Sequence, residues 1–327
     1  MIRWGILGTG LIASAFAEAV KHLPDAQITA VGSRSQETAD QFGEKYNVPR
    51  RYPTYEALAH DSQVDAIYIS TPHPMHLDNM LLCLNAGKAV LCEKPFTMNA
   101  AEAKVAVDLA RQKKLFLMEA MWTRYIPAMV RVRELLASGA IGDVRMLIAD
   151  FGFRAPFDPA HRLFAPELGG GSLLDVGVYV ISLASMVFGG APSRVTADAE
   201  LGLTGTDDQM AAVFGYANGA LAVLSSAVRT ETPQEAIISG TEGVLRIHRQ
   251  WWRPQRLTIT RVGQADEHIE IPYSANGYQY EAAEVGRCLE QGLLESPVMP
   301  LDETLTIMET LDRVRAVFGL VYPFERQ

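Results

Sequence analysis

A glycine-rich turn near the N-terminus limits most strongly how this chain can fold. A short apolar run at residues 3–7 leads directly into Gly8-Thr9-Gly10-Leu11-Ile12-Ala13, after which the spacing of apolar residues becomes helical. In a strand–turn–helix unit the first glycine permits the tight turn, the second lets a pyrophosphate approach the backbone, and a small third residue lets helix and strand pack closely. The motif predicts a dinucleotide site that includes Gly8, Thr9, Gly10, Leu11 and Ile12, with a purely structural turn as the alternative.

The rest of the chain divides into two patterns. Up to about residue 119, short apolar runs at 3–7, 28–33, 66–70, 89–92 and 115–118 alternate with helical segments at 11–22, 36–46, 74–86 and 100–113. This alternation is typical of βαβ units and a parallel sheet. After a helix at 127–138, apolar runs between residues 195 and 271 fit antiparallel strands, and helices at 278–291 and 303–317 follow.

We therefore expect an α/β protein with two domains. Residues 1–122 form a doubly wound parallel sheet, and residues 123–327 form an α/β domain on an open, mostly antiparallel sheet, whose terminal helix could pack back on the first domain. Asn218-Gly219 lies between two expected strands and predicts a hairpin with a type I′ turn, in which both central residues have positive φ.

Composition excludes several classes of partner. The 327 residues include 29 basic and 38 acidic side chains, a net charge of −9, so the chain lacks the basic footprint of proteins that bind nucleic acid or acidic membranes. Three cysteines are too few for a disulfide framework and favour a reducing compartment. No signal-peptide pattern follows Met1, which favours the cytoplasm, and Asp175 interrupts the most apolar window, residues 172–188, which predicts a buried helix there.

The end of the second expected strand bears on the choice of cofactor. An NAD site usually offers an acidic residue here to the ribose hydroxyls, but this chain reads Gly32-Ser33-Arg34-Ser35. Arg34 could stack on adenine and pair with a 2′-phosphate while Ser33 and Ser35 donate hydrogen bonds, which favours NADP and leaves NAD as the alternative. Otherwise Arg34 is a solvated loop residue.

Two further segments follow strands at the edge where open sheets bind ligands. In Ser70-Thr71-Pro72-His73-Pro74-Met75-His76 we expect Thr71, Pro72 and His76 to contact the cofactor, with a helix-capping role as the alternative. The two histidines lack an acidic or cysteine partner nearby, so no metal site is expected. Glu93-Lys94-Pro95 ends the strand at 89–92. Lys94 could donate to a substrate oxygen and lower the pKa of a nearby phenol, and the alternative is an ordinary surface lysine.

The segment from Gly169 to Tyr179 places polar residues on an apolar helix. Asp175, Tyr179 and Ser182 fall at positions i, i+4 and i+7, so they share one face of the predicted helix. Burying a carboxylate without partners is unfavourable. The stripe therefore indicates either a hydrogen-bonded core network or a functional site, and the presence of Glu93-Lys94-Pro95 favours the site.

These motifs together resemble the glucose-fructose oxidoreductase and inositol dehydrogenase (Gfo/Idh/MocA) family, over residues 2 to about 324. The resemblance is strongest to its dimeric dihydrodiol dehydrogenase and NADP-dependent xylose dehydrogenase branch, and is carried by Met118-Glu119-Ala120-Met121-Trp122-Thr123-Arg124, the 169–179 stretch, Ser185-Met186-Val187-Phe188-Gly189-Gly190 and Glu295-Ser296-Pro297-Val298-Met299-Pro300-Leu301. It implies a Rossmann domain followed by a domain with an open antiparallel sheet. Many members have histidine where this chain has Tyr179, whereas this branch has tyrosine.

The resemblance also implies roles for individual residues. Lys94 and Tyr179 would be the catalytic pair, and Asp175 would orient the site. Glu93 and Lys94 would contact the cofactor, and Tyr179 would bind substrate together with Trp122, Arg124 and Arg145. The chain departs from the branch near Glu200-Leu201-Gly202, where arginines are usual, which leaves the substrate open.

We expect an NADP-preferring dehydrogenase that moves a hydride between nicotinamide and a secondary alcohol or hemiacetal carbon of a sugar, cyclic polyol or trans-dihydrodiol. Tyr179 would act as general base. The alternatives are a reductase of anhydrofructose-type keto sugars and a non-catalytic dinucleotide sensor. Strands at 210–216 and 221–227 carry apolar or small residues on both faces, which together with the resemblance predicts a homodimer through the second sheet.

Overall fold

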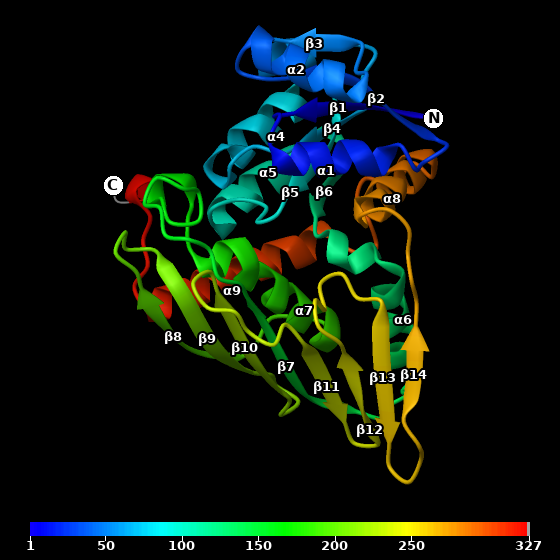
Figure 1. Cartoon of the computed structure of the whole chain (residues 1–327), viewed down its shortest axis with the longest axis vertical. Helices are drawn as coiled ribbons and strands as arrows, with labels where there is room; N and C mark the ends of the chain where they lie inside the picture. The colour runs from blue at the N-terminus through cyan, green and yellow to red at the C-terminus, as the bar shows by residue number, and fades with distance from the viewer. Residues whose placement is uncertain (326–327) are drawn as a thin grey trace. The chain divides into compact units, whose positions relative to one another are not determined.

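The computed structural model describes residues 1–325 and divides into two compact units (Figure 1). Unit 1 comprises Met1–Tyr125 and Ser274–Thr304, and unit 2 comprises Ile126–Tyr273 together with the chain from Leu305 onward. A six-stranded sheet forms the centre of unit 1, and an eight-stranded sheet forms unit 2. The α/β class and both sheet types expected from the sequence are confirmed.

The sheet of unit 1 is parallel throughout, in the order β3-β2-β1-β4-β5-β6. Its strands are β1 (Ile2–Leu7), β2 (Ala26–Gly32), β3 (Arg50–Tyr52), β4 (Ala66–Ile69), β5 (Ala89–Glu93) and β6 (Leu117–Ala120). The helices are α1 (Leu11–Val20), α2 (Gln36–Tyr46), α3 (Tyr55–Ala59), α4 (His76–Asn85), α5 (Ala100–Lys113) and α8 (Tyr278–Glu290). Every residue of β4, β5 and β6 is buried, as in parallel strands covered on both faces.

This strand order creates a switch point between β1 and β4, where the chain leaves the two strands in opposite directions. Ligands of open α/β sheets bind outside the carboxyl ends of the strands at such a point. The Gly8 turn follows β1, and the Ser70 segment follows β4. The two are joined by a hydrogen bond of 3.0 Å from the Ser70 amide to the carbonyl of Leu7.

The sheet of unit 2 has the order β14-β13-β12-β11-β7-β10-β9-β8. Its strands are β7 (Val144–Gly152), β8 (Arg194–Leu201), β9 (Asp207–Gly215), β10 (Leu221–Ala227), β11 (Ala236–Gly240), β12 (Gly243–Ile247), β13 (Arg256–Arg261) and β14 (Glu267–Glu270). Only β7 and β10 pair in parallel. The helices of this unit include α6 (Pro127–Ala137) and α7 (Val178–Phe188), which packs on β7 and β10.

The most apolar stretch of the chain lies inside unit 2. Pro166–Phe188 is long and apolar enough to cross a membrane, but 83% of its most apolar window is buried within the protein. Ser182 and Ser185 are buried there as well. This segment is the buried helix that its interrupting aspartate predicts.

The hairpin at Asn218-Gly219 exists, but its predicted turn type is wrong. Strands β9 and β10 pair in antiparallel register, with Leu221 opposite Gly215. Only Gly219 has a positive φ, of 83°, and its amide donates to the carbonyl of Tyr216 at 3.0 Å. The loop therefore has three residues, with glycine in the left-handed position that a bulge-type hairpin requires, and Asn218 does not need positive φ.

The second domain is not one continuous segment, in contrast to the expected single boundary after residue 122. The chain returns to unit 1 at Ser274, and α8 packs on α1. The Asn276 side chain donates to the carbonyl of Ala15 at 2.8 Å, and the Leu117 amide at the edge of β6 donates to the carbonyl of Leu294 at 3.1 Å. The part that returns is thus mainly α8 and its flanking loops. The terminal helix α9 (Leu301–Val317) contributes only its first four residues.

Candidate active site

The glycine turn of unit 1 has the geometry of a dinucleotide cradle. Gly8 has φ of 105°, and a side chain there would approach the Ser70 hydroxyl to 3.0 Å. Gly10 caps the N-terminus of α1, and a Cβ built on it would meet no atom within 4 Å. Since no acidic side chain lies in the first turn of α1, its free amides and helix dipole favour an anion there. The residues present fit a pyrophosphate.

The end of β2 leaves its basic side chain exposed. The Ser33 hydroxyl is bonded to those of Thr9, at 3.3 Å, and Thr38, at 2.6 Å, while Ser35 caps α2 through the Thr38 amide. Arg34 is exposed and makes no hydrogen bond or ion pair within residues 1–325. Its guanidinium is therefore available to a ligand, whereas the serine at position 35 has a structural role.

His76 joins the segment after β4 to the one after β5. It is completely buried, with Nδ1 2.9 Å from the carbonyl oxygen of Pro95 and Nε2 2.9 Å from that of Thr71. Burial lowers the pKa of this imidazole, and the neutral ring can donate to only one of the two carbonyls. The Lys94–Pro95 peptide bond is cis. His76 therefore fixes the backbone around Lys94 and is too enclosed to contact a ligand itself. Pro72, which follows Thr71, is exposed.

Glu93 lies in an acidic cluster that the sequence did not reveal. The hydroxyl of Tyr68 on β4 donates to its Oε1, and the Tyr68 ring stacks on Phe16 at 3.9 Å between centroids. Glu281 on α8 is fully buried close to Glu93, and burial together with the Glu93 charge raises its pKa well above the usual range. The raised pKa favours the neutral, protonated form of Glu281, which keeps the charge of the cluster low.

In unit 2 the predicted polar stripe lies on an irregular helix. Leu173–Gly177 forms a π-helical turn (η4), with the Val178 amide bonded to the carbonyl of Leu173, and α7 follows directly. Such turns are frequent at functional sites. Asp175 lies within it and accepts a hydrogen bond of 2.7 Å from the guanidinium of Arg162. Arg162 is the partner that a nine-tenths-buried carboxylate needs, and nothing in its sequence context singles it out.

Tyr179, one helical turn beyond Asp175, is bordered by aromatic rings. Its ring meets the edge of Phe151 at 5.2 Å between centroids, and Phe151 stacks face to face on Trp252 at 3.5 Å. Tyr179 is 6% exposed and Phe151 8% exposed. The hydroxyl-bearing ring thus adjoins a flat apolar wall, and Asp175, which pairs with Arg162, lies one turn before it on the same helix.

The remaining predicted substrate residues lie elsewhere. Arg145 is at the start of β7, paired with Asp143 at 3.1 Å, and six residues of extended strand, about 20 Å, separate it from Phe151. The structure does not bring Arg145 to Tyr179. Two more belong to unit 1, where the Trp122 ring stacks on that of Tyr278 at 4.5 Å between centroids. There the buried Arg124 pairs with Glu303 at 2.7 Å.

Comparison with known proteins identifies the family. Residues 2–121 match the oxidoreductase family with an NAD-binding Rossmann fold, and residues 129–246 match the GFO/IDH/MocA C-terminal domain. The chain belongs to the GFO/IDH/MocA oxidoreductase family. The resemblance drawn from its motifs is confirmed.

Relatives within the GFO/IDH/MocA family match over the full length. The chain is 39% identical to trans-1,2-dihydrobenzene-1,2-diol dehydrogenase of Mus musculus, over 100% of this chain and 99% of that protein. The Homo sapiens enzyme of the same name is 37% identical with the same coverage. Among solved structures, a 3-ketoreductase from Actinomadura kijaniata in complex with NADP and TDP-benzene is 27% identical, with a TM-score of 0.85 over 96% of this chain and 97% of that one.

A further solved structure with a similar fold is an aldose-aldose oxidoreductase from Caulobacter crescentus. Its TM-score is 0.88 over 97% of both chains, at 23% identity, which shows a shared fold. Together the sequence and structural matches make this protein an oxidoreductase with a dinucleotide-binding Rossmann domain.

Proposed function

We propose that this protein is an NADP-preferring dehydrogenase of small cyclic diols, with trans-dihydrodiols as its main substrate class. The observation that carries the proposal is the setting of Tyr179, whose phenol adjoins the stacked pair Phe151 and Trp252. A flat, unsaturated ring packs well against such a wall, and a sugar with hydroxyls on both faces packs less well. The dihydrodiol dehydrogenases named among the relatives support the same class.

In this proposal Tyr179 handles the proton of the reaction. A nicotinamide cofactor, when bound, would supply the hydride chemistry that the side chains lack. Tyr179 takes the proton of the substrate hydroxyl during oxidation and returns it during reduction. Arg162 holds the Asp175 side chain in place, so that the carboxylate one turn before Tyr179 can accept a hydrogen bond from a substrate hydroxyl. Lys94 takes part in the same reaction, as the family resemblance implies.

The residues of unit 1 fit the cofactor without strain. The open space at Gly10 would leave room for the pyrophosphate, and the exposed Arg34 would pair with the 2′-phosphate that distinguishes NADP from NAD. The 3-ketoreductase among the structural matches was solved with NADP, which agrees with this choice.

Reduction of a keto sugar is the second candidate. The same residues serve a ketone substrate when the hydride runs in the other direction, and a solved relative is a 3-ketoreductase. The ion pair of Arg162 and Asp175 offers both a donor and an acceptor to a polyhydroxylated ring. A non-catalytic sensor is disfavoured, because sensing does not require a phenol beside a substrate-sized aromatic wall.

We further propose a homodimer formed through the open face of the unit 2 sheet, in the cytoplasm. Ile148, Val213 and Val223 are 45%, 44% and 40% exposed, and the register places them side by side on β7, β9 and β10. An apolar row of this kind fits a subunit interface. The three cysteines are buried free thiols, as suits a reducing compartment.

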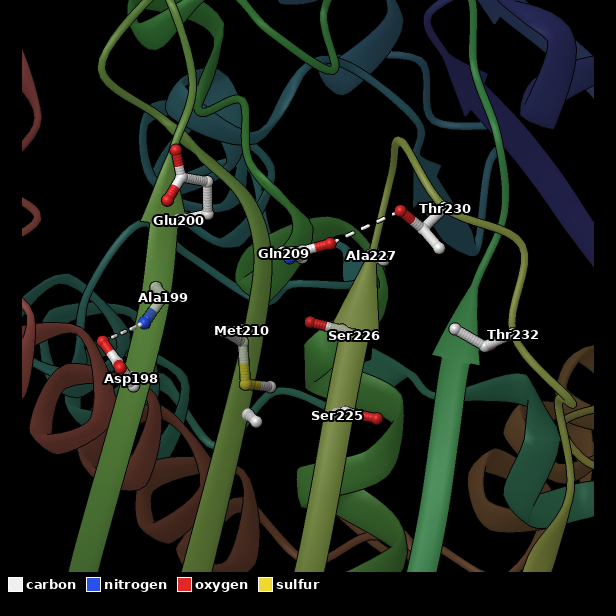
Figure 2. Close-up of a pocket in the computed structure, with 11 residues that line it drawn as sticks. Asp198, Ala199, Glu200, Gln209, Met210, Ser225, Ser226, Ala227, Thr230 and Thr232 are labelled. Atoms are coloured by element: carbon white, nitrogen blue, oxygen red, sulfur yellow. Dashed lines mark hydrogen bonds between the residues drawn. The ribbon is translucent and has the colours of Figure 1, made fainter.

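A polar groove borders this row. It has a volume of about 500 Å³ and is lined by Asp198, Ala199, Glu200, Gln209, Met210, Ala211, Ser225, Ser226, Ala227, Thr230 and Thr232. Figure 2 shows its walls, where the Thr230 hydroxyl donates to the Gln209 side chain at 3.4 Å. Ala211 and Ser225 lie two positions along the strands from Val213 and Val223. The pattern of an apolar row with a polar border matches the core and rim of an interface.

Steady-state kinetics test the proposed activity. The purified protein is assayed with NADP and NAD against trans-dihydrodiols, pentoses, hexoses, inositols and keto sugars, by absorbance of the reduced cofactor. We expect the largest kcat/KM with a trans-dihydrodiol and NADP, and turnover of the Tyr179→Phe variant lower by at least about 100-fold with cofactor affinity unchanged. Tyr216→Phe, which alters a phenol near Phe188 instead, serves as the control.

Three results would contradict parts of the proposal. If kcat/KM is higher for keto sugars, the substrates are keto sugars and not trans-dihydrodiols. If no substrate is turned over while NADP binds, the protein is a sensor. A Lys94→Ala variant is combined with Tyr179→Phe to test whether the two residues serve one step. The double variant should then be about as slow as the slower single variant, and fully additive losses would separate their roles.

A further inference from the structure

Asp207, the first residue of β9, is a fully buried carboxyl group at the start of the helix that carries Tyr179. Its Oδ2 accepts hydrogen bonds of 2.7 Å from both the Ser172 hydroxyl and the Leu173 amide. Its Oδ1 has no hydrogen-bond partner among the described residues. Burying a carboxyl group without hydrogen-bond partners is unfavourable. The bonds to Ser172 and Leu173 offset part of the free-energy cost of burying Asp207.

The backbone before the helix is shaped around this carboxyl group. Gly171 has φ of 119°, and a Cβ on it would lie 2.2 Å from Oδ1 of Asp207. The hydroxyl of Ser172 also lies 2.9 Å from that of Ser226 on β10, and Tyr322 donates from its hydroxyl to the carbonyl of Gly170 at 2.8 Å. Gly170 and Ser172 are thus held by hydrogen bonds from β9, β10 and the C-terminal segment, and Gly171 between them packs closely on Asp207.

Movement at this point is passed along the helix. Leu173 begins the π turn that contains Asp175, and α7 with Tyr179 continues from it without a break. Gly177 packs against the same Ser226, with room for no larger side chain, since a Cβ there would lie 3.0 Å from the serine hydroxyl. A shift of the first turn therefore changes where Asp175 and Tyr179 lie relative to the sheet.

We propose that Asp207 is a positioning residue, whose carboxylate anchors the first turn of the Tyr179 helix and so sets the phenol for proton transfer. This inference rests on the proposed role of Tyr179.

The titratable groups that face Asp207 are Asp208 on its own strand and Tyr322 from the C-terminal segment. Burial is the main cause that raises the pKa of Asp207, to about 7, and its bonds to Ser172 and Leu173 only partly offset this. Below that pH the group is protonated and is a weaker acceptor for the two bonds.

Stability and turnover then respond to pH in opposite directions. Because the folded-state pKa is raised, protonation of Asp207 as the pH falls through about 7 favours the folded state. The same protonation weakens the anchor and lowers kcat. A role confined to folding would instead make kcat insensitive to this titration or make it follow stability.

The Asp207→Asn variant separates these cases, with Asp143→Asn, an exposed aspartate at the start of β7, as the matched charge control. In the holoenzyme with NADP, we expect kcat of Asp207→Asn at about pH 8.5 to be about tenfold below that of the wild type. KM for NADP should be unchanged, and the melting temperature should not fall. The step in kcat near pH 7 should vanish in this variant and persist in the control. Ser172→Ala keeps the titrating group and removes one bond, so it should lose about threefold and retain the step.

Amide hydrogen exchange provides a readout that does not depend on turnover. After correction for intrinsic rates, the Leu173 amide of the wild type should exchange faster at about pH 6 than at about pH 8, and Asp207→Asn should show the faster rate at both. An unchanged pH profile of kcat in Asp207→Asn, or equal protection of Leu173 in both proteins, would overturn the anchor. If the wild type turns over no substrate, the proposed function fails, and the exchange experiment still decides whether the anchor exists.

Discussion

Arg34 is the single residue on which the proposed cofactor preference depends. Its guanidinium is exposed at the end of β2, where no carboxylate is present to bind the ribose hydroxyls of NAD. A charge-assisted bond to a 2′-phosphate contributes about 1.5–3 kcal/mol, so Arg34→Ala should raise KM for NADP by roughly 10- to 150-fold and KM for NAD far less. The nearby Arg51→Ala, which removes a guanidinium that faces Asp40 and Glu44, is the control.

The measurement is the ratio of kcat/KM for the two cofactors in each variant. Equal losses for NADP and NAD, or a wild type that prefers NAD, would contradict the cofactor assignment and leave the fold and the catalytic residues unaffected.

At the same scale, Arg162 and Arg145 show what the sequence could not reveal. Both are isolated arginines in the same half of the chain, and only tertiary folding brings the first to Asp175 and leaves the second about 20 Å along β7 from Phe151.

At the scale of elements, the helix that carries Tyr179 begins and ends at glycines with different requirements. Gly171 and Gly189 both have positive φ, of 119° and 74°. A Cβ on Gly171 would collide with Asp207, whereas one on Gly189 meets nothing within 4 Å. Gly171→Ala should therefore lower both the melting temperature and kcat, while Gly189→Ala should show only the backbone strain, about 1 kcal/mol.

Chemical denaturation and kinetics of the two variants check this contrast. Equal destabilisation by both substitutions would mean that the collision at Gly171 is relieved by local movement, and that the fit around Asp207 is looser than the structure shows.

The elements most reliably predicted from sequence were those with strong local signals. The helices at 36–46 and 100–113 have the predicted limits, because Ser35 and Asn99 cap them in the usual way. The short strand β3 was not predicted, since Arg50–Tyr52 is three half-buried residues without an apolar run. The π turn at Leu173–Gly177 was also missed; Asp207 and Ser226, which contact the residue before it, lie far away in the sequence.

At the scale of the whole molecule, the apolar row of the second sheet predicts the oligomeric state. Val223 faces outward, and its neighbour Leu224 is buried, so a charge at Val223 tests the surface without disturbing the core. The wild type should have about twice the chain mass of 35.8 kDa in sedimentation or light scattering at micromolar concentration, and Val223→Glu should shift it toward the monomer. Val262→Glu, at an exposed turn after β13, should leave the mass unchanged.

A wild-type mass near that of one chain would refute the dimer. If Val223→Glu remains a dimer, the interface lies on another surface.

The candidate site combines segments that carry sequence motifs with single residues that do not, and only the former were predictable. The glycine turn and the Glu93-Lys94-Pro95 segment follow strands whose apolar runs mark them, so their placement at one edge of the sheet was predictable. The partners Asp207 and Glu281 come from distant segments, and Arg162 from a loop 13 residues before Asp175; none of the three has a sequence pattern of its own. Each was identified only through the buried group that it neighbours.

The return of Ser274–Thr304 to unit 1 has a consequence for how the protein is made. A ribosome releases the chain from its N-terminus, so the six parallel strands emerge first, yet α1 lacks its partner α8 until nearly the whole of unit 2 has been synthesised. During that interval the side of α1 that α8 will cover remains open to solvent and to chaperones. Translation thus starts the nucleotide-binding half first, but this half can be completed only after the synthesis of the second sheet.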